Sequence, residues 1–316
     1  MEHTAEKLVD SILESYGKYR LTSKLDEENM LNKAIIIEVL EQIRRLLFPG
    51  YFDGGKMKSE YLRYHVGDRL EFIQYNLKKQ VANALASVKS GDCGRDCGGC
   101  LKSAVSARAE SAVNEFLAKI PEIREYLYTD VQAAYDGDPA AYSTDEIIFS
   151  YPGLFAITVY RIAHELFLLK IPMIPRIMTE HAHSITGIDI HPGATIGKYF
   201  FIDHGTGIVI GETTEIGDNV KIYQGVTLGA LSTRKGQQLK GVKRHPTIGD
   251  NVTIYSGTSI LGGDTVIGSG ATIGGNAFIV SSVAAGTKVS VKNPELQFSG
   301  GVSNELSQDG FWDWVI

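Results

Sequence analysis

Hydrophobic positions in the first half of the chain follow the spacing of α-helices. Leu31, Ile35, Val39 and Ile43 recur at steps of four residues, which places them on one helix face. Phe48-Pro49-Gly50 then predicts a helix end, because proline cannot continue a helix and glycine accepts a left-handed cap. The same spacing predicts further helical segments over 61–88, 101–117, 122–135, 143–169 and 174–183. We therefore expect an all-α assembly domain over residues 1–186.

A different period begins near residue 190. Aliphatic residues recur every six positions, and glycine follows many of them. The repeated positions are Ile190, Ile196, Ile202 and Ile208, then Ile210, Ile216, Ile222 and Leu228, then Ile248, Ile254 and Ile260, and finally Ile267, Ile273 and Ile279. Three hexapeptides make one triangular coil with its aliphatic residues on the axis, whereas an antiparallel sheet would alternate with period two. The pattern predicts a left-handed parallel β-helix over 187–291, and hence an α+β chain with a helical domain first.

Composition agrees with two unlike halves. The chain has 316 residues and 34 glycines, of which 22 lie between Gly187 and Gly301. A net charge of −6 argues against a nucleic-acid partner, and three cysteines argue for a reducing compartment. The N-terminus lacks the apolar segment of a signal peptide, and no apolar stretch is long enough to span a bilayer. We expect a cytoplasmic protein with no membrane partner.

Two segments interrupt this plan. Residues 230–246 break the repeat and carry five cationic side chains, so they form either a solvated loop or a flap over an anionic ligand. Cys93, Cys97 and Cys100 lie within eight residues, between two predicted helices. That spacing is known from iron–sulfur proteins, and a zinc site would need a fourth ligand; the alternative is a glycine-rich loop with redox-labile thiols. We expect no bound metal.

Histidines paired with carboxylates are the best candidates for chemistry. Asp189 and His204 are fifteen residues apart, and a coil of about eighteen residues would place them near one corner of adjacent coils. A carboxylate that holds an imidazole in one tautomer prepares it to act as a general base. The alternative is that these histidines only cap corners of the β-helix.

Several motifs resemble the signature of the serine O-acetyltransferases, a family of the hexapeptide acyltransferase superfamily. In the repeat region these are Asp189-Ile190-His191-Pro192, Asp203-His204-Gly205-Thr206-Gly207 and Arg244-His245-Pro246, and upstream they are Asp130-Val131-Gln132-Ala133, Asp138-Pro139-Ala140 and Tyr160-Arg161-Ile162. The resemblance covers about half of the chain. It implies transfer of acetyl from acetyl-CoA to the hydroxyl of L-serine, giving O-acetyl-L-serine and CoA for cysteine biosynthesis.

The resemblance also implies roles for individual residues. His204 would be the general base and Asp189 would orient it. The remaining substrate contacts would be Asp138 and Asp203 for the ammonium group, Arg244 and His245 for the carboxylate, and Glu212 in the same pocket. No cysteine lies between residues 187 and 291, so direct transfer in a ternary complex is simpler than an acyl-enzyme.

Acetyl-CoA would lie between neighbouring β-helices, which implies a homotrimer or a dimer of trimers. Small residues would let the main chain approach its pantetheine arm, namely Gly229, Ala230, Ser256, Gly257, Gly274 and Gly275. The tail over 292–316 ends in Ile316, and in the family such a terminus inserts into O-acetylserine sulfhydrylase. The alternative is a tail that folds onto its own β-helix.

Three other functions remain open at this level. The chain fits a hexapeptide acyltransferase with a different hydroxyl or amine acceptor. It also fits a zinc-dependent hydratase of the carbonic anhydrase type, which would hold its metal with histidines between subunits. A regulatory subunit that acts through its tail would have no enzymatic activity at all.

Overall fold

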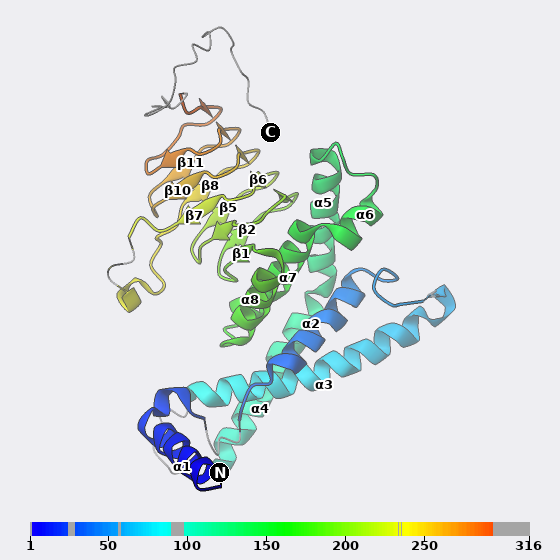
Figure 1. The fold of residues 1–316 in the computed structure, drawn as a ribbon. Coiled ribbons are helices and arrows are strands. Elements are labelled where there is room, and N and C mark those ends of the chain that lie inside the picture. Colours follow the sequence, from blue (N-terminus) through cyan, green and yellow to red (C-terminus); the bar gives the residue numbers. More distant parts are fainter. Residues whose placement is uncertain are drawn as a thin grey trace.

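The structure is a computed structural model that describes residues 2–24, 29–55, 58–89, 98–232, 234 and 236–292. Helices form the first part of the described chain and parallel strands the second (Figure 1). The α-helices are α1 (Glu2–Lys18), α2 (Lys33–Leu47), α3 (Leu62–Lys89), α4 (Gly98–Ala118), α5 (Ile120–Gly137), α6 (Thr144–Ser150), α7 (Pro152–Leu168) and α8 (Ile174–Thr186). Cys93, Cys97 and the tail over 293–316 lie outside the described residues.

The helical segment predicted over 143–169 is interrupted at Tyr151. The helix α6 ends at Ser150 and α7 begins at Pro152, while Tyr151 between them has an extended backbone with φ −77° and ψ 117°. The residue before a proline avoids the helical region, and proline fits the first turn of the next helix. The interruption places the Tyr151 side chain at the start of α7, beside the end of α5.

The strands form three parallel sheets that wind into a β-helix. One sheet has the order β1-β4-β7-β10-β13, the second β11-β8-β5-β2, and the third β14-β12-β9-β6-β3. The strands are β1 (Asp189–Ile190), β2 (Thr195–Ile196), β3 (Phe201–Asp203), β4 (Val209–Ile210), β5 (Glu215–Ile216), β6 (Lys221–Tyr223), β7 (Thr227–Gly229), β8 (Thr247–Ile248), β9 (Thr253–Ile254), β10 (Ser259–Leu261), β11 (Val266–Ile267), β12 (Thr272–Ile273), β13 (Phe278–Ile279) and β14 (Lys288–Val289). The predicted fold class is confirmed.

The aliphatic residues of the repeat stack on one another along the axis. Ile196 lies opposite Ile216, which lies opposite Ile248 on the next coil, and all three are buried. The first coil is longer than the second, since Ile190 lies opposite Ile210 but Ile210 lies opposite Leu228. The additional residues extend the corner between β3 and β4, which carries His204.

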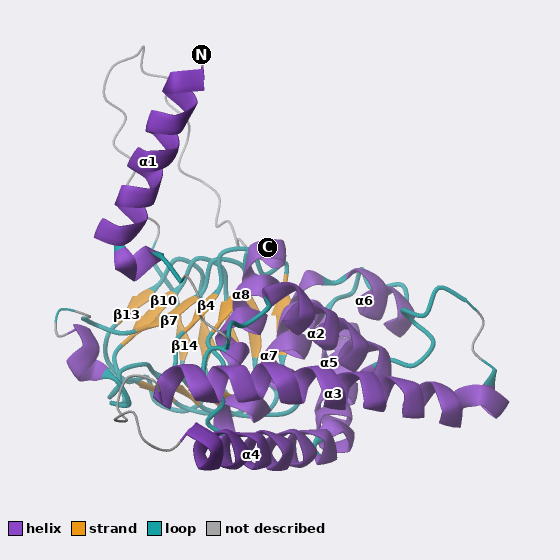
Figure 2. Cartoon of the chain, turned by 90° about the horizontal axis from the view of Figure 1, so that it is seen from below, coloured by secondary structure: helices purple, strands orange, loops and turns teal. Residues whose placement is uncertain are grey.

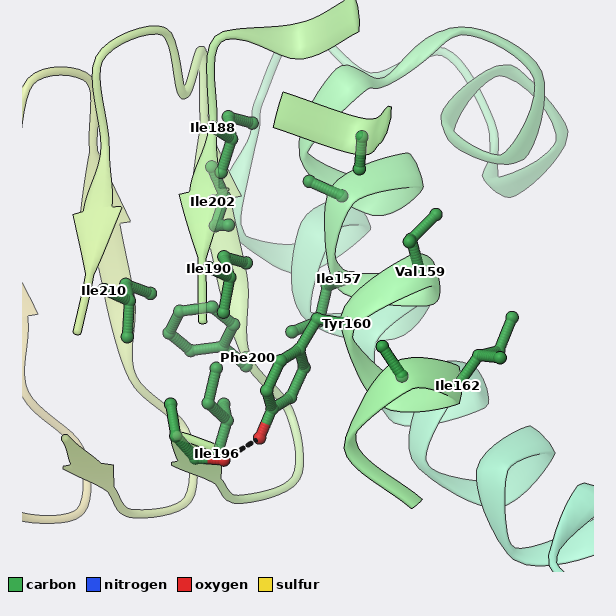
Figure 3. Close-up of a cluster of buried hydrophobic side chains, with 14 of the residues drawn as sticks. Ile157, Val159, Tyr160, Ile162, Ile188, Ile190, Ile196, Phe200, Ile202 and Ile210 are labelled. Carbon is green, nitrogen blue, oxygen red and sulfur yellow. Dashed lines mark hydrogen bonds between the residues drawn. The ribbon is translucent and has the colours of Figure 1, made fainter. Parts of the chain in front are cut away.

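The helices α5 and α7 are fixed to the first coil by buried polar contacts. Arg161 donates two hydrogen bonds to the Asp130 carboxylate, at 2.6 and 2.8 Å, and a third to the carbonyl of Gly197 at 2.8 Å. Tyr160 reaches from α7 into the β-helix and donates to the carbonyl of Ala194 at 2.6 Å (Figure 3). Two motifs quoted above, around Asp130 and Arg161, therefore join the two parts of the chain.

The helix α1 projects from the rest of the fold (Figure 2). It exposes several large apolar side chains, among them Leu8, Val9 and Leu13. Within the residues described, no helix combines the length and apolar character needed to cross a membrane.

Candidate active site

His204 occupies the corner between β3 and β4. Its backbone is left-handed, with φ +57°, and the next residue, Gly205, also has a positive φ of +90°. This turn directs the imidazole outward, so 69% of the side chain is exposed. Nε2 lies 3.8 Å from Oδ1 of Asp203, the last residue of β3. The corner therefore presents an accessible imidazole beside a carboxylate.

Asp138 joins this corner from the helical domain. It caps the C-terminus of α5, and its carboxylate accepts hydrogen bonds from the Tyr151 hydroxyl at 2.6 Å and from the Ala140 amide at 2.8 Å. The Tyr151 hydrogen bond lowers the pKa of the Asp138 carboxyl most, and the charges of Lys221 and His204 lower it further. Asp138 is therefore an anion at neutral pH, close to His204.

Lys221 on β6 connects Asp203 with the end of α5. Its ammonium donates to the carbonyl of Gly137 at 2.6 Å and lies 3.6 Å from Oδ2 of Asp203. The side chain crosses the rings of Phe201 and Tyr223, whose centroids lie 4.9 and 4.8 Å from Nζ. Asp138, Asp203 and His204, which the sequence marks separately, thus form one group that we call the His204 group.

Glu212, Arg244 and His245 gather at the corner between β4 and β5, and we call them the Arg244 group. The Arg244 guanidinium is ion-paired with the Glu212 carboxylate. The imidazole of His245 accepts at Nδ1 from the Thr213 amide, at 3.0 Å. Burial, reinforced by the charge of Arg244, lowers the pKa of His245 to about 4. His245 is therefore neutral at pH 7, with its proton on Nε2.

Asp189 contacts neither His204 nor any other histidine through a hydrogen bond or ion pair within the described chain. Its carboxylate instead lies 3.5 Å from the Arg176 guanidinium, which is also paired with Glu180 on α8. Glu180, His183 and Asp189 place potential metal-binding atoms within 4.8 Å of one another. Arg176 pairs with two of these three residues, so a cationic side chain already offsets part of the negative charge of this cluster.

The two groups lie on different corners of the same β-helix. The His204 group precedes β4 and the Arg244 group follows it, so the face that contains β4 separates them. A face of five to six extended residues spans roughly 15–20 Å. A ligand the size of an amino acid cannot contact both groups of a single chain.

The residues predicted to contact the coenzyme divide between the same two edges. Ser256, Gly257, Gly274 and Gly275 lie between the sheet of β9 and β12 and the sheet of β10 and β13, on the His204 edge. Gly229 ends β7, and Ala230 begins the excursion on the Arg244 edge. Gly257 has a positive φ of +69°, and a Cβ atom there would lie 2.4 Å from Oδ1 of Asn276, so the fold of this corner already favours glycine. Their contact with a coenzyme stays a prediction.

The excursion over 230–246 leaves the β-helix after β7 and returns at β8. Lys243 donates to the carbonyl of Thr213 at 2.7 Å and lies 3.0 Å from the Glu215 carboxylate. Arg244 is held by Glu212 and by the carbonyl of Leu239, at 3.1 Å. Two of the five cations therefore pair with carboxylates of the β-helix instead of standing free for an anionic ligand.

Several residues of the site carry no signal in the repeat pattern. Tyr151, Lys221 and Arg176 contact the predicted carboxylates, yet each belongs to an element distant in sequence from its partner. The Thr213 hydroxyl oxygen accepts hydrogen bonds from the amide of Arg244, at 2.9 Å, and from the amide of His245, at 3.1 Å. The available signals were the Tyr-Pro break for Tyr151 and, for Lys221, a cation between Val220 and Ile222.

A hexapeptide β-helix with an exposed imidazole and carboxylates on one corner is typical of the hexapeptide acyltransferases. No family model matches the chain. The chain is 44% identical over 272 residues to a serine acetyltransferase of Synechococcus elongatus. This match covers 84% of this chain and 83% of the relative. The chain belongs to the serine acetyltransferase family.

Solved structures agree with this assignment. Serine acetyltransferase isoform 3 of Entamoeba histolytica, in complex with cysteine, superposes with a TM-score of 0.69 at 33% identity, and the match covers 95% of this chain and 96% of that one. Soybean serine acetyltransferase complexed with serine has a TM-score of 0.51 at 29% identity, covering 79% of this chain and 94% of that one.

Proposed function

We propose that the protein transfers acetyl from acetyl-CoA to the hydroxyl of L-serine, giving O-acetyl-L-serine and CoA. Membership of the serine acetyltransferase family supports this reaction, and the soybean relative was solved with serine bound. The observation that carries the proposal is that Lys221 links the end of α5, where Asp138 lies, to Asp203, which lies beside the exposed imidazole of His204. Two carboxylates suit the ammonium group of an amino acid and leave its hydroxyl to the imidazole.

In this mechanism the neutral imidazole of His204 takes the proton from the serine hydroxyl as the oxygen attacks the thioester carbonyl. The carbon–sulfur bond then breaks, and the proton passes from the imidazolium to the leaving thiolate of CoA. A positioned base of this kind contributes on the order of 10²–10⁴ in rate. No cysteine lies between residues 187 and 291, which supports direct transfer in a ternary complex. Asp189 is proposed to orient His204 once several copies of the chain have assembled.

The carboxylate of serine is assigned to Arg244 and His245, with Glu212 lining the same pocket. Arg244 supplies a guanidinium fork, and neutral His245 supplies a donor at Nε2. Because one face of the β-helix separates the two groups, the substrate needs the His204 group of one copy and the Arg244 group of another. We therefore propose a homotrimer, or a dimer of trimers, with its active sites between copies.

Acetyl-CoA is proposed to lie along these edges, against the small residues named above, with no metal required. The excursion over 230–246 also carries Arg234 and Lys240, which we assign to its phosphates. Ile316, which lies outside the described residues, is proposed to bind O-acetylserine sulfhydrylase. Deletion of Ile316 should abolish that binding and leave acetyl transfer intact, and a loss of acetyl transfer instead would contradict this role.

An acceptor series tests the proposed substrate. CoA thiol release from acetyl-CoA should be rapid with L-serine and slow with 3-hydroxypropionate, which lacks the ammonium group, and with ethanolamine, which lacks the carboxylate. Comparable rates with all three would contradict recognition of both charged ends. A larger kcat/KM for a sugar or amine acceptor would instead favour a different hexapeptide acyltransferase.

A further inference from the structure

Asp138 and the residue before it, Gly137, are each held by a side chain that takes no part in the chemistry proposed above. The hydroxyl of Tyr151 donates to Oδ2 of Asp138 at 2.6 Å. The ammonium of Lys221 donates to the carbonyl of Gly137, the preceding residue, also at 2.6 Å. The first contact comes from the start of α7 and the second from β6. The end of α5 is thus hydrogen-bonded both to the start of α7 and to β6.

We propose that Tyr151 and Lys221 are positioning residues that hold the Asp138 carboxylate beside Asp203 and thereby set the affinity for the amino group of the acceptor. This inference rests on the proposed function, in which Asp138 and Asp203 bind the substrate ammonium. In this role neither residue binds the substrate itself, and each acts through a carboxylate that does.

The Tyr151 contact fixes the rotation of the carboxylate. Oδ2 of Asp138 accepts from the Tyr151 hydroxyl while Oδ1 accepts from the Ala140 amide, so each oxygen has one protein donor. Each oxygen keeps a further lone pair for a ligand. Burial, followed by the hydrogen bond to Asp138, raises the pKa of Tyr151, so its hydroxyl remains a donor throughout the working pH range.

The Lys221 contact fixes the distance between the two carboxylates. Nζ bonds to Gly137 at the end of α5 and lies 3.6 Å from Asp203 on β3, so one side chain bridges the two elements. Its aliphatic stem is confined by the rings of Phe201 and Tyr223. A Cβ atom at Gly137 would lie 2.7 Å from the Phe201 ring, so the end of α5 is seated closely on the β-helix.

Steady-state kinetics of Tyr151→Phe and Lys221→Met test the proposal. Phenylalanine removes only the hydroxyl, and methionine keeps most of the stem between the two rings. Each variant loses one hydrogen bond that involves a charged group. We therefore expect the KM for serine to rise about tenfold in each variant. We expect the KM for acetyl-CoA and kcat to stay within about twofold of wild type.

The pH profile gives a readout that a purely structural role would not move. Tyr151 lowers the pKa of Asp138, so Tyr151→Phe should shift the acid limb of serine binding, measured as Kd against pH, to higher pH. Tyr160→Phe is the matched control, because it also removes a hydroxyl of α7 that bonds to another element, the β-helix, but at a distance from the His204 group. It should lower the melting temperature and leave the KM for serine and the acid limb unchanged.

Asp138→Asn distinguishes a failure of the positioning role from a failure of the proposed function. If Asp138→Asn raises the KM for serine while Tyr151→Phe and Lys221→Met do not, the positioning role is wrong and the proposed function stands. If Asp138→Asn leaves that KM unchanged, the ammonium role of Asp138 is wrong, and the positioning role falls with it. A lower KM in Lys221→Met would mean that Lys221 only repels the substrate ammonium, which would overturn its part.

Discussion

Arg244 is ion-paired with Glu212, a residue 32 positions earlier in the chain, and the pair closes the base of the excursion onto the corner between β4 and β5. The excursion therefore ends on the β-helix with a guanidinium held in place. A held guanidinium loses little side-chain freedom when it binds a second carboxylate, which suits the role proposed for it.

Replacement of Arg244 by methionine should raise the KM for serine by at least about tenfold, because the substrate carboxylate loses a charge-assisted partner. The KM for acetyl-CoA should change little. Lys243→Met is the matched control, since Lys243 is the neighbouring cation but pairs with a different carboxylate, that of Glu215. Equal effects of the two variants on serine would mean that the excursion acts only through its total charge.

Mixing of two impaired variants tests whether the site is shared between copies. His204→Ala and Arg244→Met chains, co-expressed with different tags and purified as mixed assemblies, should recover activity. In a mixed trimer, one of the three interfaces then pairs an intact His204 with an intact Arg244. Activity no greater than the sum of the separate variants would place the whole site within one chain.

The lowered pKa of His245 predicts a dependence of stability on pH. An unfolded histidine titrates near 6.5, whereas His245 in the fold titrates near 4, so the unfolded state binds more protons between these values. The free energy of unfolding should therefore fall as pH decreases from about 6.5 to about 4. Denaturant titrations of wild type and His245→Asn should show a smaller fall in the variant, and equal falls would contradict the assignment.

The buried ion pair between Asp130 and Arg161 should dominate the attachment of the helical domain to the β-helix. Asp130→Ala leaves the guanidinium buried without its carboxylate, which costs about 3–5 kcal/mol in comparable cases. Chemical denaturation measures this loss. Lys78→Ala breaks a largely exposed pair with Glu110 and should cost no more than about 1 kcal/mol. Similar losses for the two variants would contradict the special role of the buried pair.

The β-helix follows from the sequence because each coil repeats the same local requirement. Ile196, Ile216 and Ile248 are separated by whole coils, and each must be apolar to reach the axis, so the period is visible without a structure. The corner residue His204 is marked differently, by the motif Asp203-His204-Gly205-Thr206-Gly207 that resembles the family signature. Local repetition is the kind of information that a single sequence retains.

The environment of the site follows from docking between distant segments, which no local pattern records. Tyr151 and Lys221 meet the end of α5 only because α5 and α7 pack on the first coil. Spacing alone suggested that Asp189 would lie near His204, whereas the packing of α8 beside β1 brings Arg176 to Asp189. Such contacts depend on helix placement in three dimensions.

The most direct test of the central claim is thiol release from acetyl-CoA in the presence of L-serine, compared between wild type and His204→Ala. Removal of the proposed general base should lower kcat by about 10²–10⁴ while the melting temperature stays close to that of wild type, because the imidazole is largely exposed. Undiminished kcat in His204→Ala would contradict the account.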